Sequence, residues 1–213
     1  MNVGRRMSYP VFTVQPETPI VKAHELMAHE KVHRAPVVKN GKLVGIITEN
    51  DILKAYPSTA TSLAVWEITA LLAKITVKDI MVKNVQTVQE DTLIEDAARI
   101  IADRKISALP VLRGTELVGI ITETDLFRIM LEMLGARHPG VRFSVLMPYQ
   151  PGQIAKLTQA VYQKGGNIVA LNTFEGDSSE NFMMTLKVEN VEQETLRQLI
   201  EPLVLKLIEI DTI

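Results

Sequence analysis

Residues 43–51 read Leu-Val-Gly-Ile-Ile-Thr-Glu-Asn-Asp, and residues 117–125 read Leu-Val-Gly-Ile-Ile-Thr-Glu-Thr-Asp. In both stretches an apolar strand ends at a threonine and an aspartate follows three residues later, which is typical of a strand that enters a helix through a capping box. The threonine would accept an amide hydrogen of the first helical turn, and the aspartate would offset the helix dipole. The same two groups could instead hold a sugar diol and a phosphate at the helix start.

The two stretches belong to a longer internal repeat. When the chain is shifted by 74 residues, residues 3–53 superpose on residues 77–127 without a gap, and 21 of these 51 pairs are identical. The identical pairs include Met7/Met81 and Gly45/Gly119 as well as the capping residues. The chain therefore contains one fold unit twice.

Each copy is expected to fold as strand, helix, hairpin and helix. In the first copy the pattern predicts a short strand over residues 11–14 and a helix that is capped by Thr18 and has Pro19 at its first position. Asn40-Gly41 is a strong signal for a hairpin between the next two strands. The helix that follows Thr48 should end near residue 57. One copy of about 55 residues would be marginally stable alone, so the two copies are expected to pack sheet to sheet.

The segment between the copies and the C-terminal third have different patterns. Residues 57–62 are rich in turn formers, and residues 63–72 predict an apolar helix that Ser62 caps and that carries Trp66. From residue 141 onward the order βαββαβ implies a ferredoxin-like sandwich with both helices on one sheet face. The other face must be covered, so a homodimer is expected. The expected C-terminal elements are strand 142–147, a helix between Pro151-Gly152 and Gly165-Gly166, strands 167–174 and 182–188, helix 191–200 and strand 204–210.

Composition excludes several classes of function. The net charge of −2 and the pI near 6.1 give no electrostatic footprint for nucleic acid. The absence of cysteine excludes disulfides and thiolate chemistry, and no signal peptide or long apolar run is present, so a soluble cytoplasmic protein is expected. His24 and His29 are five residues apart and share a helical face poorly, so neither a metal site nor a cofactor is expected.

The two copies resemble CBS domains, and the pair resembles a Bateman module. The resemblance rests on the Gly-Ile-Ile-Thr-x-x-Asp ending, the Pro-Val strand of the hairpin and the Thr-Val opening strand, which recur in register. Residues 141–213 resemble an ACT domain through the βαββαβ order and the segment Gln150-Pro151-Gly152-Gln153-Ile154. The whole architecture is similar to that of acetoin-utilisation regulators. It implies an α+β protein with CBS domains over 1–57 and 76–134, a loop and helix over 58–75, a linker over 135–140 and an ACT-like domain over 141–213.

This resemblance implies that AMP, ADP or ATP binds in clefts between the two copies. His33-Arg34-Ala35-Pro36 is similar to the segment that contacts phosphate in the regulatory γ subunit of AMP-activated kinases. The pseudo-symmetric cleft has Ser107-Ala108 in place of the cationic pair, which favours a nucleoside or no ligand. The first cleft would combine Thr122, Asp125, Val11, Phe12, His33, Arg34 and Pro36. The second would combine Thr48, Asp51, Val85, Gln86, Ser107, Ala108 and Pro110.

Three classes of function follow. The first is a non-enzymatic regulatory sensor in which the nucleotide changes the relation of the two copies and thereby an unknown protein target. It could also hold a small amino acid at an ACT dimer interface through backbone near Gly152, Gln153 and Ile154. The second is a structural or scaffolding dimer without a ligand, in which the acids only cap helices. The third is an enzyme, which is disfavoured because no catalytic triad, metal cluster, phosphate loop or dinucleotide fingerprint occurs.

Overall fold

The structure is a computed structural model that describes residues 1–56, 67 and 71–213. The chain divides into two compact units, residues 1–126 and residues 127–213. Most of the predicted connecting helix, with Ser62 and Trp66, lies outside the described residues. None of the helices in the described part is long and apolar enough to cross a membrane.

The first unit contains the two repeats and has the predicted hairpins. Asn40 and Gly41 both have positive φ, +51° and +77°, as a tight turn between antiparallel strands requires. Both hairpins carry a bulge at the same repeat position, after Val37 and after Val111. The elements are η1 (Val3–Arg5), α1 (Ile20–His29), β1 (Arg34–Lys39), β2 (Lys42–Thr48) and α2 (Glu49–Ala55) in the first repeat, then α4 (Val77–Ile80), β3 (Val88–Gln89), α5 (Ile94–Arg104), β4 (Ala108–Arg113) and β5 (Glu116–Thr122). Helix α6 (Glu123–Met133) begins in the first unit and continues into the second, which starts at Phe127.

The start of the first repeat differs from the prediction. No strand forms over residues 11–14, where a single bridge joins Val14 to Val37. In the second repeat the equivalent pairing extends into β3 because the amide of Glu90 donates to the carbonyl of Leu112. The residue equivalent to Glu90 is Pro16, which has no amide hydrogen and therefore ends the ladder. Helix α1 begins at Ile20 after Pro19, and the predicted cap by the Thr18 side chain is wrong.

The two repeats exchange their opening segments. Ser8 forms a backbone bridge to Ile120 on β5, and Val82, its counterpart 74 residues later, forms the same bridge to Ile46 on β2. The adjacent methionines seal these contacts. A Cβ atom added to Gly119 would lie 2.3 Å from Sδ of Met7, and one added to Gly45 would lie 2.5 Å from Sδ of Met81. Each repeat is thus completed by the segment that precedes the other.

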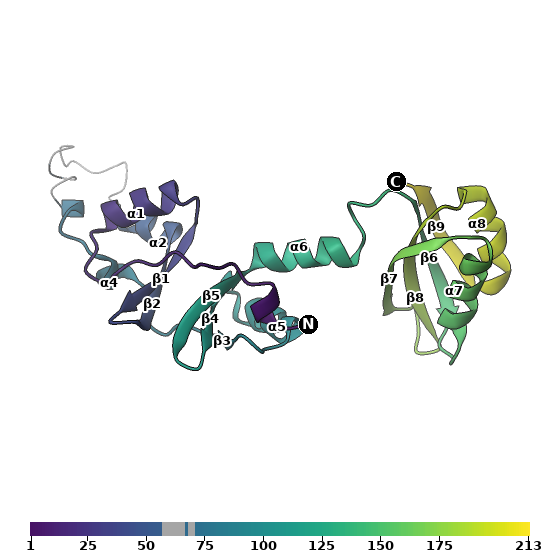
Figure 1. Ribbon diagram of the computed structural model, residues 1–213, viewed down its shortest axis with the longest axis horizontal. Helices are drawn as coiled ribbons and strands as arrows, with labels where there is room; N and C mark the ends of the chain where they lie inside the picture. Colours follow the sequence, from purple (N-terminus) through teal and green to yellow (C-terminus); the bar gives the residue numbers. More distant parts are fainter. Residues whose placement is uncertain (57–66, 68–70) are drawn as a thin grey trace. The chain divides into compact units, whose positions relative to one another are not determined.

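The second unit is a four-stranded antiparallel sheet with the predicted βαββαβ order. Its strand order is β7-β8-β6-β9, and Figure 1 shows α7 and α8 together on one face. The core lies between that face and the helices, where Phe143 and Leu186 meet Leu157 and Leu196. The last helix and strand each begin two residues later than predicted. The elements are β6 (Val141–Pro148), α7 (Gln153–Gln163), β7 (Asn167–Glu175), β8 (Asn181–Glu189), α8 (Gln193–Ile200), η2 (Glu201–Leu203) and β9 (Lys206–Thr212).

The opposite face of this sheet is partly covered by the chain itself. The Nζ atom of Lys187 on β8 donates a hydrogen bond to the carbonyl of Gly135 at 3.1 Å. The side-chain amide of Asn172 on β7 donates to the carbonyl of Met133 at 3.3 Å. The expectation that a second copy must cover this face therefore applies only to the remainder of it, and the homodimer stays a prediction.

Candidate functional site

The predicted capping boxes are present at both strand-to-helix junctions. Oδ2 of Asp51 accepts the Thr48 amide at 2.9 Å, and the Asp51 amide donates to Oγ1 of Thr48 at 3.2 Å. The corresponding distances for Asp125 and Thr122 are 3.0 and 3.2 Å. The two junctions therefore have the same cap, and any functional difference between them must come from the residues around the aspartates.

The surroundings of Asp125 come from both repeats. Asp125 is buried, with 6% of its surface exposed, and its Oδ1 atom accepts a hydrogen bond from Oγ of Ser8 at 3.5 Å. Ser8 lies in the opening segment of the first repeat, which continues to Val11 and Phe12. The opening segment of the first repeat thus contacts the acid of the second repeat through Ser8, a residue that the sequence did not single out. We call the predicted set Thr122, Asp125, Val11, Phe12, His33, Arg34 and Pro36 the first adenylate site, and both the site and its ligand are predictions.

Arg34 lies at the start of β1 and reaches the second repeat. Its guanidinium donates to the backbone carbonyl of Ser107, just before β4. Burial lowers the pKa of Arg34, and the nearby carboxylates of Glu123 and Asp125 oppose this shift. Asp125 therefore acts electrostatically on Arg34, and the cleft that the sequence predicts around these two residues stays a prediction.

His33 does not act together with Arg34 in this structure. Its Nδ1 atom lies 2.7 Å from Oε2 of Glu49 on α2, and the Nε2 atom of His24 lies 3.5 Å from Oε1 of the same carboxylate. The His33 side chain is 79% exposed. Successive side chains of an extended segment point to opposite sides, so His33 turns toward its own repeat while Arg34 turns toward the other. His33 is thus held by Glu49, and a phosphate contact by Arg34 stays a prediction.

The histidine contacts around Glu49 predict a pH dependence. Hydrogen bonds from His33 and then His24 lower the pKa of Glu49. A carboxyl group with a lowered pKa stabilises the folded state above its unfolded pKa, near pH 4.3, and this contribution is lost as the pH falls through the folded pKa. The Glu49→Gln variant should therefore lose less stability than the wild type between about pH 5 and pH 3. Urea unfolding at a series of pH values measures this, and parallel curves for the two proteins would contradict it.

The other residues predicted for the two clefts occupy equivalent places in the two repeats. Pro36 and Pro110 are buried in β1 and β4, opposite Ile46 and Ile120. Val11 and Phe12 follow the Ser8 bridge, and Val85 and Gln86 follow the Val82 bridge. Phe12 also packs against the core of the first repeat. The second site, made of Thr48, Asp51, Val85, Gln86, Ser107, Ala108 and Pro110, has Ala108 at the position equivalent to Arg34.

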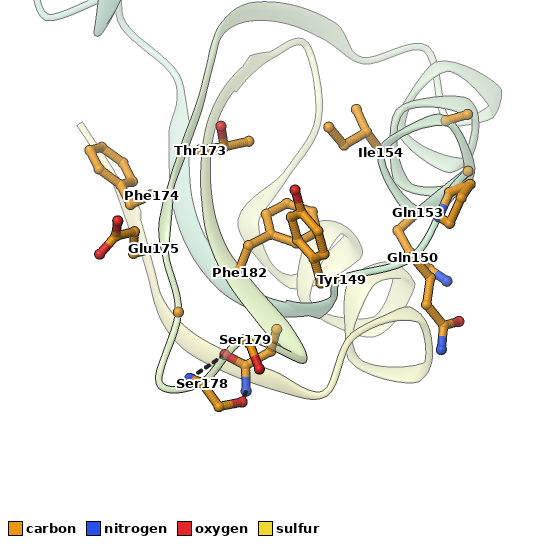
Figure 2. A pocket seen from close by; sticks show the side chains of 15 residues that line it. Tyr149, Gln150, Gln153, Ile154, Thr173, Phe174, Glu175, Ser178, Ser179 and Phe182 are labelled. Atoms are coloured by element: carbon orange, nitrogen blue, oxygen red, sulfur yellow. Dashed lines mark hydrogen bonds between the residues drawn. The ribbon is translucent and has the colours of Figure 1, made fainter.

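The second unit contains a wide pocket of about 1200 Å³ at the start of α7. Figure 2 shows Gln153 and Ile154 on one side and Thr173 and Phe174 on the other, with Tyr149 and Phe182 between them. The rings of Tyr149 and Phe182 meet edge to face, with centroids 6.1 Å apart. The three residues predicted to bind an amino acid, Gly152, Gln153 and Ile154, all line this pocket.

The sequence did not predict the side of the pocket that the β7–β8 hairpin forms. The tip of the β7–β8 hairpin is held by Asn181, whose Oδ1 atom accepts the Asp177 amide at 2.8 Å and whose Nδ2 atom donates to Ser178. This turn brings Glu175 and Ser179 to the pocket rim. Polar residues at 175–180 indicate a solvent-exposed turn, and the sequence carries no signal that this turn faces α7. Among the described residues, no group of three metal-ligating side chains occurs.

Both repeats match the model of one known family. The model of the CBS domain family matches residues 3–58 and 77–132. An inosine-5′-monophosphate dehydrogenase of Thermoplasma acidophilum is 29% identical over 178 residues, which are 83% of this chain. The chain spans only 33% of that relative's length and between 22% and 36% of the other first curated relatives.

Several solved structures resemble the repeat pair. The CBS domain pair of protein MJ0100, in complex with 5′-methylthioadenosine and S-adenosyl-L-methionine, is 29% identical with a TM-score of 0.52, over 65% of this chain and 98% of that one. CBSX2 in complex with AMP is 28% identical with a TM-score of 0.52, over 61% and 96% of the two chains. A putative acetoin utilisation protein from Vibrio cholerae, AcuB, is 26% identical with a TM-score of 0.53, over 64% and 95%.

Proposed function

Since this chain belongs to the CBS domain family, we propose that it is a non-enzymatic regulatory sensor that binds an adenine nucleotide at the first adenylate site. The observation that supports the proposal is that residues of the first repeat reach the second: Ser8 donates a hydrogen bond to Asp125, and Arg34 donates one to the carbonyl of Ser107. Asp125 also acts on the pKa of Arg34. A carboxylate can accept both ribose hydroxyls, and a guanidinium can hold a phosphate through two parallel hydrogen bonds. A ligand that contacts both repeats changes their relation only through different affinities for two arrangements.

The charge of the site favours AMP over more highly charged nucleotides. Arg34 is the cation that we propose for the phosphate, and Glu123 and Asp125 lie close enough to act on its pKa. A triphosphate would add several negative charges next to two carboxylates, whereas a monophosphate adds about two. Solved relatives of this family bind AMP, 5′-methylthioadenosine and S-adenosyl-L-methionine, which supports an adenosine core for the ligand. In the second site, which lacks the arginine, we propose an uncharged adenosine compound or no ligand.

Binding to the wide pocket is a separate part of the proposal. The first turn of α7 carries no acidic residue, so its amides could donate hydrogen bonds to a carboxylate near Gly152, Gln153 and Ile154, where the helix dipole favours a negative charge. Glu175 on the opposite rim could meet an ammonium group. We propose a small amino acid as ligand and an ACT-like role for this unit. The volume of about 1200 Å³ exceeds the roughly 300–1,000 Å³ of most ligand pockets, and the homodimer that we propose would narrow the pocket if the second copy packed over it.

A thermal-shift panel tests the sensor against a ligand-free scaffold. AMP at about 100 times its Kd should stabilise the protein by about 2.7 kcal/mol, which corresponds to roughly 5–10 °C for a chain of this size. ADP, ATP, adenosine, 5′-methylthioadenosine, S-adenosyl-L-methionine and the amino acids complete the panel, with GMP as the control for the base. If none of these compounds shifts the melting temperature, the scaffold is the better description, and turnover of a nucleotide would favour an enzyme.

A further inference from the structure

Helix α6 ends in a complete Schellman motif. The Gly135 amide donates to the carbonyl of Glu132 at 3.0 Å, and the Ala136 amide donates to the carbonyl of Leu131 at 2.9 Å. Gly135 has φ +60°, the left-handed conformation that this motif needs. The motif fixes the direction in which the chain leaves α6 and satisfies two of the last carbonyls of the helix.

Two further carbonyls of this turn bind to the sheet of the second unit. Lys187 donates to the carbonyl of Gly135, and Asn172 donates to the carbonyl of Met133. Lys187 is buried, with 4% of its surface exposed, and burying an ammonium group is costly without a partner. Here the ammonium lies at the C-terminal end of a helix, where the dipole favours a positive charge. This contact therefore gives the buried lysine both a hydrogen bond and charge compensation.

Gly135 itself packs directly on the sheet. A Cβ atom added to Gly135 would lie 3.1 Å from Cγ1 of Val169 and 3.2 Å from Cβ of Ala170. Only a residue without a side chain approaches β7 this closely without displacing its neighbours. The contact between the end of α6 and the sheet is thus a close-packed one, supported by two side-chain hydrogen bonds.

We propose that residues 133–136 form a strap that fastens the end of α6 to the sheet of the second unit and carries the state of the first adenylate site to that sheet. Helix α6 begins at Glu123, Asp125 in its first turn accepts a hydrogen bond from Ser8 of the first repeat at 3.5 Å, and the helix ends in the strap. If a ligand displaces Asp125, helix α6 can pass this movement to the sheet of the second unit only when the C-terminal end of the helix is fixed to that sheet. The strap rests on the proposed function and adds to it the part of the protein that responds to the ligand, which is the sheet of the second unit.

The ligand-free part of the test measures the strap alone. In the full chain, Lys187→Met removes the ammonium group but keeps a long apolar side chain in the buried position. Amide hydrogen exchange over residues 133–138 should become at least about tenfold faster than in the wild type. Lys206→Met is the matched control, because this lysine is exposed on β9 of the same sheet, and its exchange profile should be unchanged. Unchanged exchange over residues 133–138 in Lys187→Met would overturn the strap.

The second part of the test adds AMP as the probe. In the wild type, saturating AMP should change exchange over residues 133–138 and in β8, whereas Lys187→Met should bind AMP and lose the change in β8. AMP that raises the melting temperature of the wild type without any change over residues 133–138 would overturn the transmission and leave the proposed function standing. AMP that produces no thermal shift would refute both the proposed function and the transmission, while the ligand-free result still decides the strap.

Discussion

Asp125→Ala is expected to abolish the rise in melting temperature that AMP produces. The carboxylate would accept both ribose hydroxyls, and each hydrogen bond to a charged group contributes about 1.5–3 kcal/mol. Its loss should weaken AMP at least about 100-fold, which removes the shift at ligand concentrations that saturate the wild type. Isothermal titration calorimetry and thermal unfolding with and without AMP measure this effect.

The internal repeat provides the control for this variant. Asp51 caps α2 with hydrogen bonds that match those of Asp125 to within 0.1 Å. Asp51→Ala should therefore lose the same capping contribution, about 1 kcal/mol, and yet keep the response to AMP. Two variants that lose the AMP response equally would indicate an effect of helix fraying, and an Asp125→Ala protein that binds AMP normally would contradict the proposed site.

Arg34→Ala is expected to weaken AMP about 10–100-fold and to leave adenosine within about twofold. The guanidinium is half-buried between the repeats, where a charge-assisted bond to phosphate is screened less than at the surface. Arg34→Lys should recover part of the affinity, because lysine restores the charge without the planar fork. Calorimetric titration with AMP and adenosine separates the phosphate from the nucleoside.

The reciprocal variant is Ala108→Arg, which introduces a guanidinium at the equivalent position of the second site. If the cation decides phosphate binding, this protein should bind AMP with a stoichiometry that rises from one towards two. Ala108 is buried, so the melting temperature of the Ala108→Arg protein without ligand must be compared with that of the wild type.

The outcome that would contradict the phosphate contact concerns Arg34→Ala. This variant would then lose affinity for AMP and for adenosine by the same factor.

The parts of the fold that local patterns specify were predictable from the sequence. The two Thr-x-x-Asp segments predict capping boxes because the cap involves residues only three positions apart, and the structure has both. Asn40-Gly41 predicts the hairpin for the same reason. The βαββαβ order of the second unit follows from the alternation of apolar residues in its strands and helices. In each case the deciding contacts are close in the chain.

The features that the sequence concealed depend on partners that are distant in the chain. Ser8 pairs with Ile120, and nothing in residues 1–10 indicates that they belong with the other repeat. His33 and Arg34 are adjacent and invite a shared role, but the backbone directs them to different repeats. Lys187 looks like an ordinary exposed lysine of a strand, and its burial becomes visible only when Gly135 is placed on the sheet.

Because the opening segment of each repeat packs on the other repeat, neither repeat contains all the residues of its own fold. A chain cut within residues 57–66 would leave the first half with Met7 and no Gly119 to receive it, and the second half with Met81 and no Gly45. The separated pieces should stay incomplete on their own and recover the fold by complementation when they are mixed. Because both repeats are in one chain, they complete each other without the association step that two separate polypeptides would need.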